Sequence, residues 1–224
     1  KINFFPENLN VQNQKIILRL DLNVPLKDKI IQDDTRIALC LPFIKKLVEK
    51  KAKIIIISHL GRPKGAKVPE LSLIPIYKYL KKFIQTNIYF FMGNLYDGVQ
   101  DKFSHLKEGE IILLENIRYF KEESNNDENF SKRLGSLGDI YINDAFSCSH
   151  RKQASIHNIT KFVKHSYAGP LMKKEIEAIN LVIQNKKKPV TCIIGGSKIS
   201  TKINIISSLI EKVNNLIIVG AMAN

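Results

Sequence analysis

Residues 54–63 read IIIISHLGRP, so four consecutive isoleucines are followed at once by small, polar and basic residues. An apolar run without alternating polar residues is typical of a strand that is covered on both faces, as in a parallel sheet. Similar runs occur at residues 16–22, 88–92, 111–114, 140–142, 190–194 and 216–219. We therefore expect these runs to be strands of parallel sheets.

The segments between the runs have helical periodicity. Apolar residues recur at helical spacing within residues 36–51 and again within residues 175–184. Strands that alternate with helices favour an α/β fold, in which helices cover both faces of a parallel sheet and form a three-layer sandwich.

A change of pattern after Pro170 predicts a domain boundary. A mostly helical stretch over residues 171–185 leads into Lys186-Lys187-Lys188-Pro189, after which the strand–helix pattern restarts. We expect a first domain over residues 1–170, a connecting helix or hinge over residues 171–188, and the incomplete start of a second domain over residues 189–224.

Several protein classes are excluded by composition. The apolar runs are far shorter than the roughly 18 residues of a membrane-spanning helix, and the N-terminal residues have no extended apolar segment with a cleavage site. The three cysteines, Cys40, Cys148 and Cys192, are widely spaced and form neither a disulfide framework nor a zinc pattern. These features favour a reducing, cytoplasmic location.

The charge requires an anionic partner. The chain of 224 residues has 35 Lys and Arg against 21 Asp and Glu, a formal net charge of +14. Nucleic acid, a membrane surface and phosphorylated small molecules are the candidate partner classes. Many lysines are spread over predicted helices, whereas arginines follow strand ends, and this distribution favours small phosphorylated molecules over nucleic acid or a membrane.

The residues that follow the predicted strands are the candidate ligand-binding residues, because open parallel sheets bind ligands beyond the carboxyl ends of their strands. Those that follow a strand or begin the next helix are Asp21, Asn23, Arg36, His59, Arg62, Arg118 and Arg151. A guanidinium group matches the oxygens of a phosphate or carboxylate. Asp21 and Asn23 are suited to hold a hydroxyl group between them.

A second cluster, Gly195-Gly196-Ser197-Lys198-Ile199-Ser200-Thr201-Lys202, follows a predicted strand and begins a predicted helix. Glycines there allow backbone N–H groups to approach an anion at a helix N-terminus. Lys198 and Lys202 are four residues apart and share one helix face. The cluster suits nucleotide phosphates, although it matches neither the Walker A nor the dinucleotide-binding pattern.

Taken together, these segments resemble the phosphoglycerate kinase family. The matching pieces occur in the family's order; they are RLDLNVP (19–25), DTRI (34–37), SHLGRP (58–63), LENIR (114–118), NDAF (143–146), HR (150–151) and GGSKISTK (195–202). The resemblance covers essentially the whole chain. It implies a monomeric kinase with two Rossmann-like domains that close about a hinge.

The resemblance also implies an activity and a set of site residues. The family transfers a phosphoryl group reversibly between 1,3-bisphosphoglycerate and ADP, with magnesium, giving 3-phosphoglycerate and ATP. Carried over by motif, the phosphoglycerate site comprises Asp21, Asn23, Arg36, His59, Leu60, Gly61, Arg62, Arg118 and Arg151. The nucleotide side comprises Gly195, Gly196, Lys198 and Lys202. Arg36 and Lys198 would act on the transferring phosphoryl group.

The sequence departs from the family pattern in three ways. Leu22 stands where phenylalanine is common, and Ser147-Cys148-Ser149 stands where Gly-Thr-Ala is expected. The family continues for about as long again, so the magnesium ligand is expected beyond Asn224 and no metal ligand is assigned here. The 224 residues alone are expected to be inactive. A nucleic-acid-binding protein and a non-catalytic phosphate-binding protein remain the alternatives.

Overall fold

The computed structural model describes residues 2–96, 99–183, 188–196 and 202–223. The chain divides into two compact units, Lys1–Lys173 and Lys174–Asn224, and the division falls within helix α6 (Pro170–Ile183). The domain boundaries expected from the sequence remain predictions. Each unit is described by itself below.

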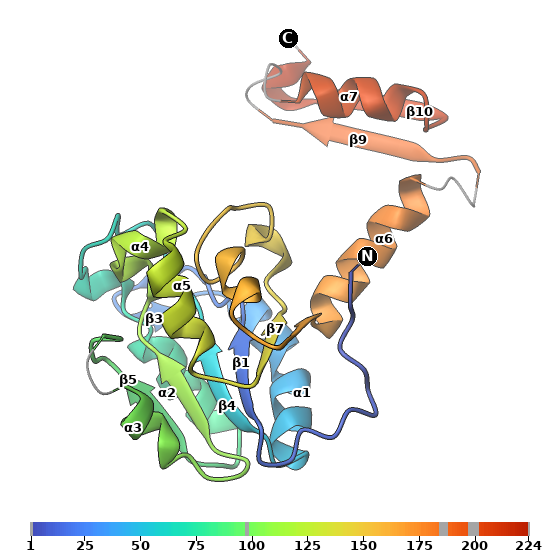
Figure 1. The fold of residues 1–224 in the computed structure, drawn as a ribbon. Coiled ribbons are helices and arrows are strands. Elements are labelled where there is room, and N and C mark those ends of the chain that lie inside the picture. The colour runs from blue at the N-terminus through green and yellow to red at the C-terminus, as the bar shows by residue number, and fades with distance from the viewer. Residues whose placement is uncertain (1, 97–98, 184–187, 197–201, 224) are drawn as a thin grey trace. The chain divides into compact units, whose positions relative to one another are not determined.

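The first unit is built on a six-stranded parallel sheet (Figure 1). In spatial order its strands are β5 (Ile88–Phe91), β6 (Ile111–Leu114), β4 (Lys53–Ile57), β1 (Lys15–Arg19), β7 (Ile140–Asn143) and β8 (His165–Ala168). Each neighbouring pair is parallel. This arrangement confirms the α/β fold expected from the sequence.

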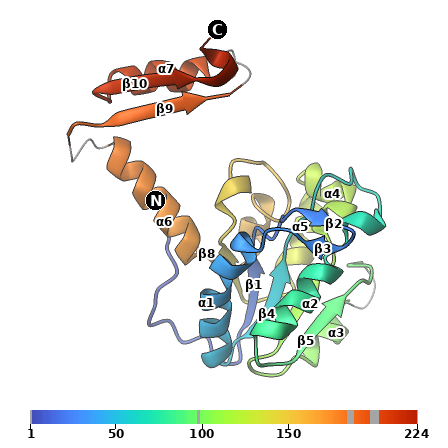
Figure 2. The same ribbon diagram turned by 180° about the vertical axis from the view of Figure 1, so that it is seen from behind.

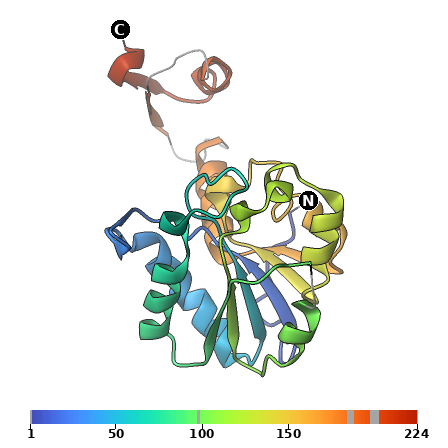
Figure 3. The same cartoon turned by 90° about the vertical axis from the view of Figure 1, so that its left-hand side faces the viewer.

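Helices cover both faces of this sheet (Figure 3). Helices α1 (Thr35–Glu49) and α2 (Ile74–Phe83) lie in front of it in Figure 2, and α3 (Val99–Ser104) and α5 (Glu128–Gly135) lie on the opposite face. A short helix, α4 (Lys121–Ser124), precedes α5. The unit therefore has the three layers that the apolar runs predict.

Strand β4 shows why those runs are strands. Ile54 and Ile56 belong to the core beneath α1 and α2, whereas Ile55 and Ile57 belong to the core on the other face. Successive side chains of a strand point to opposite faces, so a sheet covered twice requires apolar residues at every position. Each buried isoleucine stabilises the fold by about 1.5–3 kcal/mol.

The first strand is shorter than the apolar run that predicts it. Strand β1 ends at Arg19, opposite Ile57 of β4 and Asn143 of β7. Leu20 and Leu22 lie beyond the strand and are still fully buried in the core. The expectation of a strand through residue 22 is wrong because the chain leaves the sheet while it continues to supply core side chains.

The structure contains an edge strand and a hairpin that the apolar runs do not predict. Strand β8, with the sequence HSYA, carries polar residues and pairs with β7 on one side. On its other side Ala168 exchanges backbone hydrogen bonds with Asn3 and Phe5, which stabilises a short strand of weak apolar pattern. The hairpin of β2 (Leu26–Lys27) and β3 (Ile30–Ile31) is too short for any periodicity.

The second unit contains a parallel pair, β9 (Thr191–Gly195) and β10 (Asn215–Val219), and helix α7 (Ile203–Ile210). Most of its apolar side chains are exposed; Ile193 is 65 % and Ile217 is 45 % accessible. In the part of the chain that the structure describes, no helix combines the length and apolarity that crossing a membrane requires.

Candidate functional site

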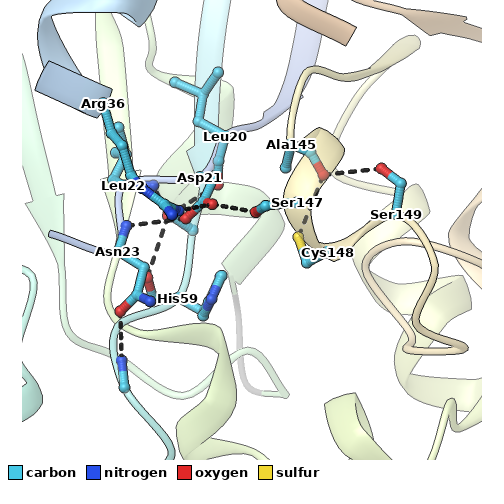
Figure 4. A network of polar contacts seen from close by, with 12 residues as sticks. Leu20, Asp21, Leu22, Asn23, Arg36, His59, Ala145, Ser147, Cys148 and Ser149 are labelled. Carbon is cyan, nitrogen blue, oxygen red and sulfur yellow. Dashed lines mark hydrogen bonds and ion pairs between the residues drawn. The ribbon is translucent and has the colours of Figure 1, made fainter. Parts of the chain in front are cut away.

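The carboxyl ends of β1, β4 and β7 lie level, since Arg19 is opposite both Ile57 and Asn143. The segments that leave these ends therefore meet at one edge of the sheet. Asp21 is at the centre of the resulting polar network, which Figure 4 shows from close by.

Three donors hold the Asp21 carboxylate. Its Oδ1 accepts a hydrogen bond of 3.1 Å from the backbone N–H of Asn23. Its Oδ2 forms an ion pair with the Arg36 guanidinium and accepts a hydrogen bond from the Ser147 hydroxyl (Figure 4). Burial by itself would raise the pKa of Asp21, but these hydrogen bonds and the charge of Arg36 outweigh it and lower the pKa. Asp21 is therefore ionised at neutral pH.

A glycine joins this network to the next strand end. Asn23 Oδ1 accepts a hydrogen bond of 2.9 Å from Gly61 N, and the Gly61 carbonyl accepts one of 2.8 Å from Arg118 Nη1. Gly61 has a φ of +60°, and a Cβ there would lie 2.6 Å from a methyl carbon of Leu71. Only glycine fits this position without a shift of its neighbours.

Leu60, also expected in the site, has its side chain in the hydrophobic core. Its carbonyl accepts a hydrogen bond of 2.7 Å from Asn116 Nδ2. Leu60 therefore ties the loop after β4 to the loop after β6, and its side chain faces other apolar groups.

His59 lies within electrostatic reach of three other expected binding residues, Asp21, Arg118 and Arg151. Burial is the largest cause that lowers its pKa, to about 3, and the charges of Arg19, Arg118 and Arg151 lower it further while Asp21 opposes them. The residue is 4 % exposed. It is therefore a neutral group among cations at neutral pH.

The arginines differ in how they are held. Arg36 is half-exposed and paired with Asp21, whereas Arg62 and Arg151 are exposed and form no ion pair with a described residue. Arg118 is buried, and its Nε has no hydrogen-bond partner within the described residues. Burial and the charges of Arg19 and Arg151 lower the pKa of Arg118. The site thus holds cationic charge that nearby carboxylates do not neutralise.

The structure thus brings together most of the residues expected to bind phosphoglycerate. The group linked by hydrogen bonds, an ion pair or electrostatic interactions comprises Asp21, Asn23, Arg36, His59, Gly61, Arg118 and Arg151. Arg62 follows Gly61 in the chain and, within the described residues, forms no hydrogen bond or ion pair with the others. Their roles in binding remain predictions.

Sequence reasoning missed the residues beneath this group. Arg19, Glu123 and Ser155 are completely buried and hydrogen-bonded to one another. An arginine inside an apolar strand run is the signal that draws attention to Arg19. The hydrogen bond from the Ser147 hydroxyl to Asp21 has no signal in the sequence beyond the departure of Ser147-Cys148-Ser149 from the family pattern.

The glycine-rich cluster in the second unit is described in part. Lys198 lies outside the described residues. Gly195, Gly196 and Lys202 lie together, because Lys202 Nζ donates a hydrogen bond of 2.7 Å to the Gly195 carbonyl. A Cβ on Gly196, whose φ is +154°, would lie 2.1 Å from Lys202 Nζ. The glycine therefore makes room for an ammonium group at the strand end, and this arrangement fits an anion.

Metal-binding potential is limited in the described part of the chain. Within residues 2–96, 99–183, 188–196 and 202–223, no group of three or more His, Cys, Asp or Glu side chains is arranged to hold a metal ion. None of these residues is assigned to magnesium.

Comparison with known proteins gives one consistent answer. The family model for phosphoglycerate kinase matches residues 7–224. The chain is 49 % identical over 218 residues to a phosphoglycerate kinase of Wolbachia pipientis wMel and 42 % identical over 219 residues to one of Clostridium novyi (strain NT). Each alignment covers 97 % of this chain and 54 % or 55 % of the relative.

Solved structures agree. The phosphoglycerate kinase of Coxiella burnetii superposes with a TM-score of 0.85 at 40 % identity, over 97 % of this chain and 54 % of that one. The enzyme of Pyrococcus horikoshii OT3 superposes with a TM-score of 0.86 at 28 % identity, over 99 % of this chain and 56 % of that one. The chain spans about half the length of the curated relatives it matches.

Proposed function

The chain belongs to the phosphoglycerate kinase family, and from that premise we propose that it is the phosphoglycerate-binding part of an enzyme of central carbon metabolism. The enzyme transfers a phosphoryl group reversibly between 1,3-bisphosphoglycerate and ADP, giving 3-phosphoglycerate and ATP. The activity belongs to the whole protein. The chain Lys1–Asn224 by itself would bind phosphoglycerate weakly and would not turn over.

The observation that carries this proposal is the group of cations around one ionised carboxylate at the strand ends. Arg62, Arg118 and Arg151 would bind the phosphate of 3-phosphoglycerate, because their charges are not neutralised by nearby carboxylates. Asp21 and Asn23 would bind the glycerate hydroxyl. A substrate with a phosphate at one end, a hydroxyl in the middle and a carboxylate at the other end matches this arrangement.

The chemistry needs no covalent protein nucleophile. The substrate carboxylate attacks the transferring phosphoryl group or leaves from it, so catalysis rests on positioning and on stabilisation of the equatorial oxygens. Arg36, held at one end by Asp21 and half-exposed, would supply such charge, together with Lys198. Magnesium, when bound, neutralises phosphate charge, and the described residues offer it no ligand set.

Gly195, Gly196 and Lys202 of the second unit would hold nucleotide phosphates. The space over Gly196 and the ammonium group beside it support this assignment. The proposed enzyme is a cytoplasmic monomer that acts on small molecules. Cys40 and Cys148 are buried and unpaired, which fits a reducing compartment.

The test is calorimetry with 3-phosphoglycerate and with ADP on the full-length protein, together with a coupled assay for ATP. Binding of both ligands without turnover would favour a phosphate-binding protein that lacks catalysis. In the active enzyme, Arg36→Ala should lower kcat by about 10²-fold or more, because it removes charge stabilisation of the transition state. An unchanged kcat would contradict the role of Arg36.

A further inference from the structure

We propose that Glu123, Ser155 and Arg19 form a buried relay that fixes the ring orientation and the tautomer of His59, so that His59 donates a hydrogen bond from Nε2 to a ligand at the strand ends. None of the three relay residues would touch the ligand, so they are positioning residues. The identity of the ligand as 3-phosphoglycerate rests on the proposed function, whereas the tautomer of His59 does not.

The relay is continuous and contains good hydrogen-bond geometry at each step. The Glu123 carboxylate accepts two hydrogen bonds from Ser155, one of 2.8 Å from its N–H and one of 2.7 Å from its hydroxyl. The Ser155 hydroxyl in turn accepts a hydrogen bond of 3.0 Å from Arg19 Nε. All three residues are 0 % exposed. Water therefore does not compete for these groups.

The remaining guanidinium nitrogens link strand β1 to His59. Arg19 Nη1 donates to the Leu20 carbonyl at 2.5 Å, and Arg19 Nη2 lies 3.2 Å from His59 Nδ1. The Ser155 carbonyl is itself held by the hydroxyl of buried Tyr141 at 2.7 Å. Both ends of the guanidinium group are thereby fixed, which is a requirement for a rigid contact with the imidazole.

The contact with Arg19 determines the tautomer of His59. A guanidinium group has only donors and keeps its proton at any ordinary pH, so Nδ1 must accept this hydrogen bond. In a neutral imidazole the proton then resides on Nε2. Within the described residues, Nε2 has no hydrogen-bond partner, and the ring interacts electrostatically with Asp21, which Figure 4 draws in the same network. Nε2 is therefore the nitrogen that is left to donate to a ligand.

Electrostatics explains why a carboxylate lies at the far end of the relay. A buried guanidinium group requires a compensating negative charge, and Glu123 supplies it through Ser155. Burial raises the pKa of Glu123, while Arg19 and the hydrogen bonds from Ser155 oppose the rise. On the other side, Arg118 and Arg151 disfavour a protonated His59. The ring can therefore donate one hydrogen bond to an anion as a neutral group.

The first test is nitrogen NMR of the full-length protein, labelled with ¹⁵N-histidine, at neutral pH. The chain has five histidines, and the spectrum of His59→Gln identifies the signals of His59. We expect one tautomer, with Nδ1 at the unprotonated position and Nε2 coupled to a proton. A proton on Nδ1, or a ring protonated at neutral pH, would overturn the proposal without any variant of the relay being made.

The second test compares two relay variants with a matched control. Ser155→Ala and Glu123→Gln should move the His59 Nδ1 signal toward the protonated position, because the ring then exchanges between tautomers. Ser131 is also completely buried, and its hydroxyl donates to the backbone carbonyls of Asp127 at 2.6 Å and Ala154 at 3.4 Å and to no side chain of the relay. Ser131→Ala should therefore leave the His59 spectrum unchanged. An unchanged spectrum in a folded Ser155→Ala protein would contradict the relay.

Titration with 3-phosphoglycerate separates the two proposals. Binding that shifts the Nε2–H signal supports donation from His59, and Ser155→Ala should weaken this binding by about threefold to tenfold while the KM for ADP stays unchanged. Binding that leaves the Nε2–H signal unmoved overturns the donation. Absence of binding, with the single tautomer present, contradicts the proposed function and leaves the relay established.

Discussion

Strands β4 and β10 have nearly the same kind of sequence and very different surroundings. Strand β4 reads KIIII and β10 reads NLIIV. All four isoleucines of β4 are 0 % exposed, whereas Ile217, Ile218 and Val219 of β10 are 45 %, 37 % and 41 % exposed. An apolar run therefore predicts a strand of a parallel sheet, but its burial depends on which elements cover the two faces.

The two units differ in the same way at their candidate sites. In the first unit, side chains from several strand ends are held by hydrogen bonds to one another, and a second layer of buried polar residues lies beneath them. In the second unit, as described, Lys202 folds back onto the Gly195 carbonyl.

Matched substitutions in strands β4 and β10 should show the largest difference in the free energy of unfolding. In the chain Lys1–Asn224, Ile56→Ala should lower the free energy of unfolding by about 2–5 kcal/mol, because it leaves a cavity in a closed core. Ile217→Ala should lower it by less than about 1 kcal/mol, since its side chain is 45 % exposed. Urea unfolding measures both values. Equal losses would contradict the contrast between the two units.

Substitution of a glycine in each of the two sites should have a smaller effect on stability and should also change ligand binding. Gly61→Ala should destabilise the first unit by about 1–3 kcal/mol, because the new Cβ meets Leu71 in a left-handed backbone conformation. It should also weaken 3-phosphoglycerate binding, since Gly61 links Asn23 to Arg118. Gly196→Ala should weaken ADP binding instead, because its Cβ displaces the ammonium end of the Lys202 side chain.

Gly109→Ala is the control for these two variants. Gly109 also has a positive φ, of +76°, but a Cβ there would meet its nearest atom, the Val48 carbonyl oxygen, at 3.4 Å. This variant carries the backbone strain without the collision. Calorimetry with each ligand and urea unfolding provide the comparison. A Gly61→Ala protein that is no less stable than Gly109→Ala would show that Leu71 adjusts freely.

The sequence predicts the parts of the fold in which the local apolar pattern agrees with the burial of the same residues in the structure. The isoleucines of β4 face two closed cores, so the run and the strand coincide. The apolar run at residues 16–22 extends beyond the end of strand β1, because Leu20 and Leu22 are core residues that lie outside the strand. Strand β8 depends on pairing with β7 and with Asn3 and Phe5, which its sequence does not reveal.

The residues of the candidate site likewise fall into those that the sequence could predict and those that it could not. Asp21, Asn23 and Arg118 could be found because residues at strand ends meet at one edge of a parallel sheet. Glu123 could not, because a glutamate in the helix sequence KEES is normally a solvated surface residue. Its burial arises from the loop that carries Ser155, which is 32 residues away in the chain. Contacts of this kind become visible only once the fold is known.

The smallest expected effect concerns the acid stability of the first unit. The hydrogen bonds and the nearby cations lower the pKa of Asp21 below its ordinary value of 3.8. A carboxyl group with a lowered pKa in the folded state stabilises the fold above the unfolded pKa, and this contribution is lost as the pH falls through the folded pKa. Asp21→Asn should therefore cost about 1 kcal/mol at pH 7, and the loss should shrink below about pH 4.

Urea unfolding of Asp21→Asn and the unsubstituted chain at several pH values measures this difference. The two curves of stability against pH should converge in acid, because protonation removes from the unsubstituted chain the same charge that the substitution removes. Ser149→Ala is a control from the same loop, since the Ser149 hydroxyl donates to the Ala145 carbonyl and not to Asp21 (Figure 4). A constant difference at all pH values would mean that the Asp21 carboxylate stabilises the unit by packing rather than by its charge.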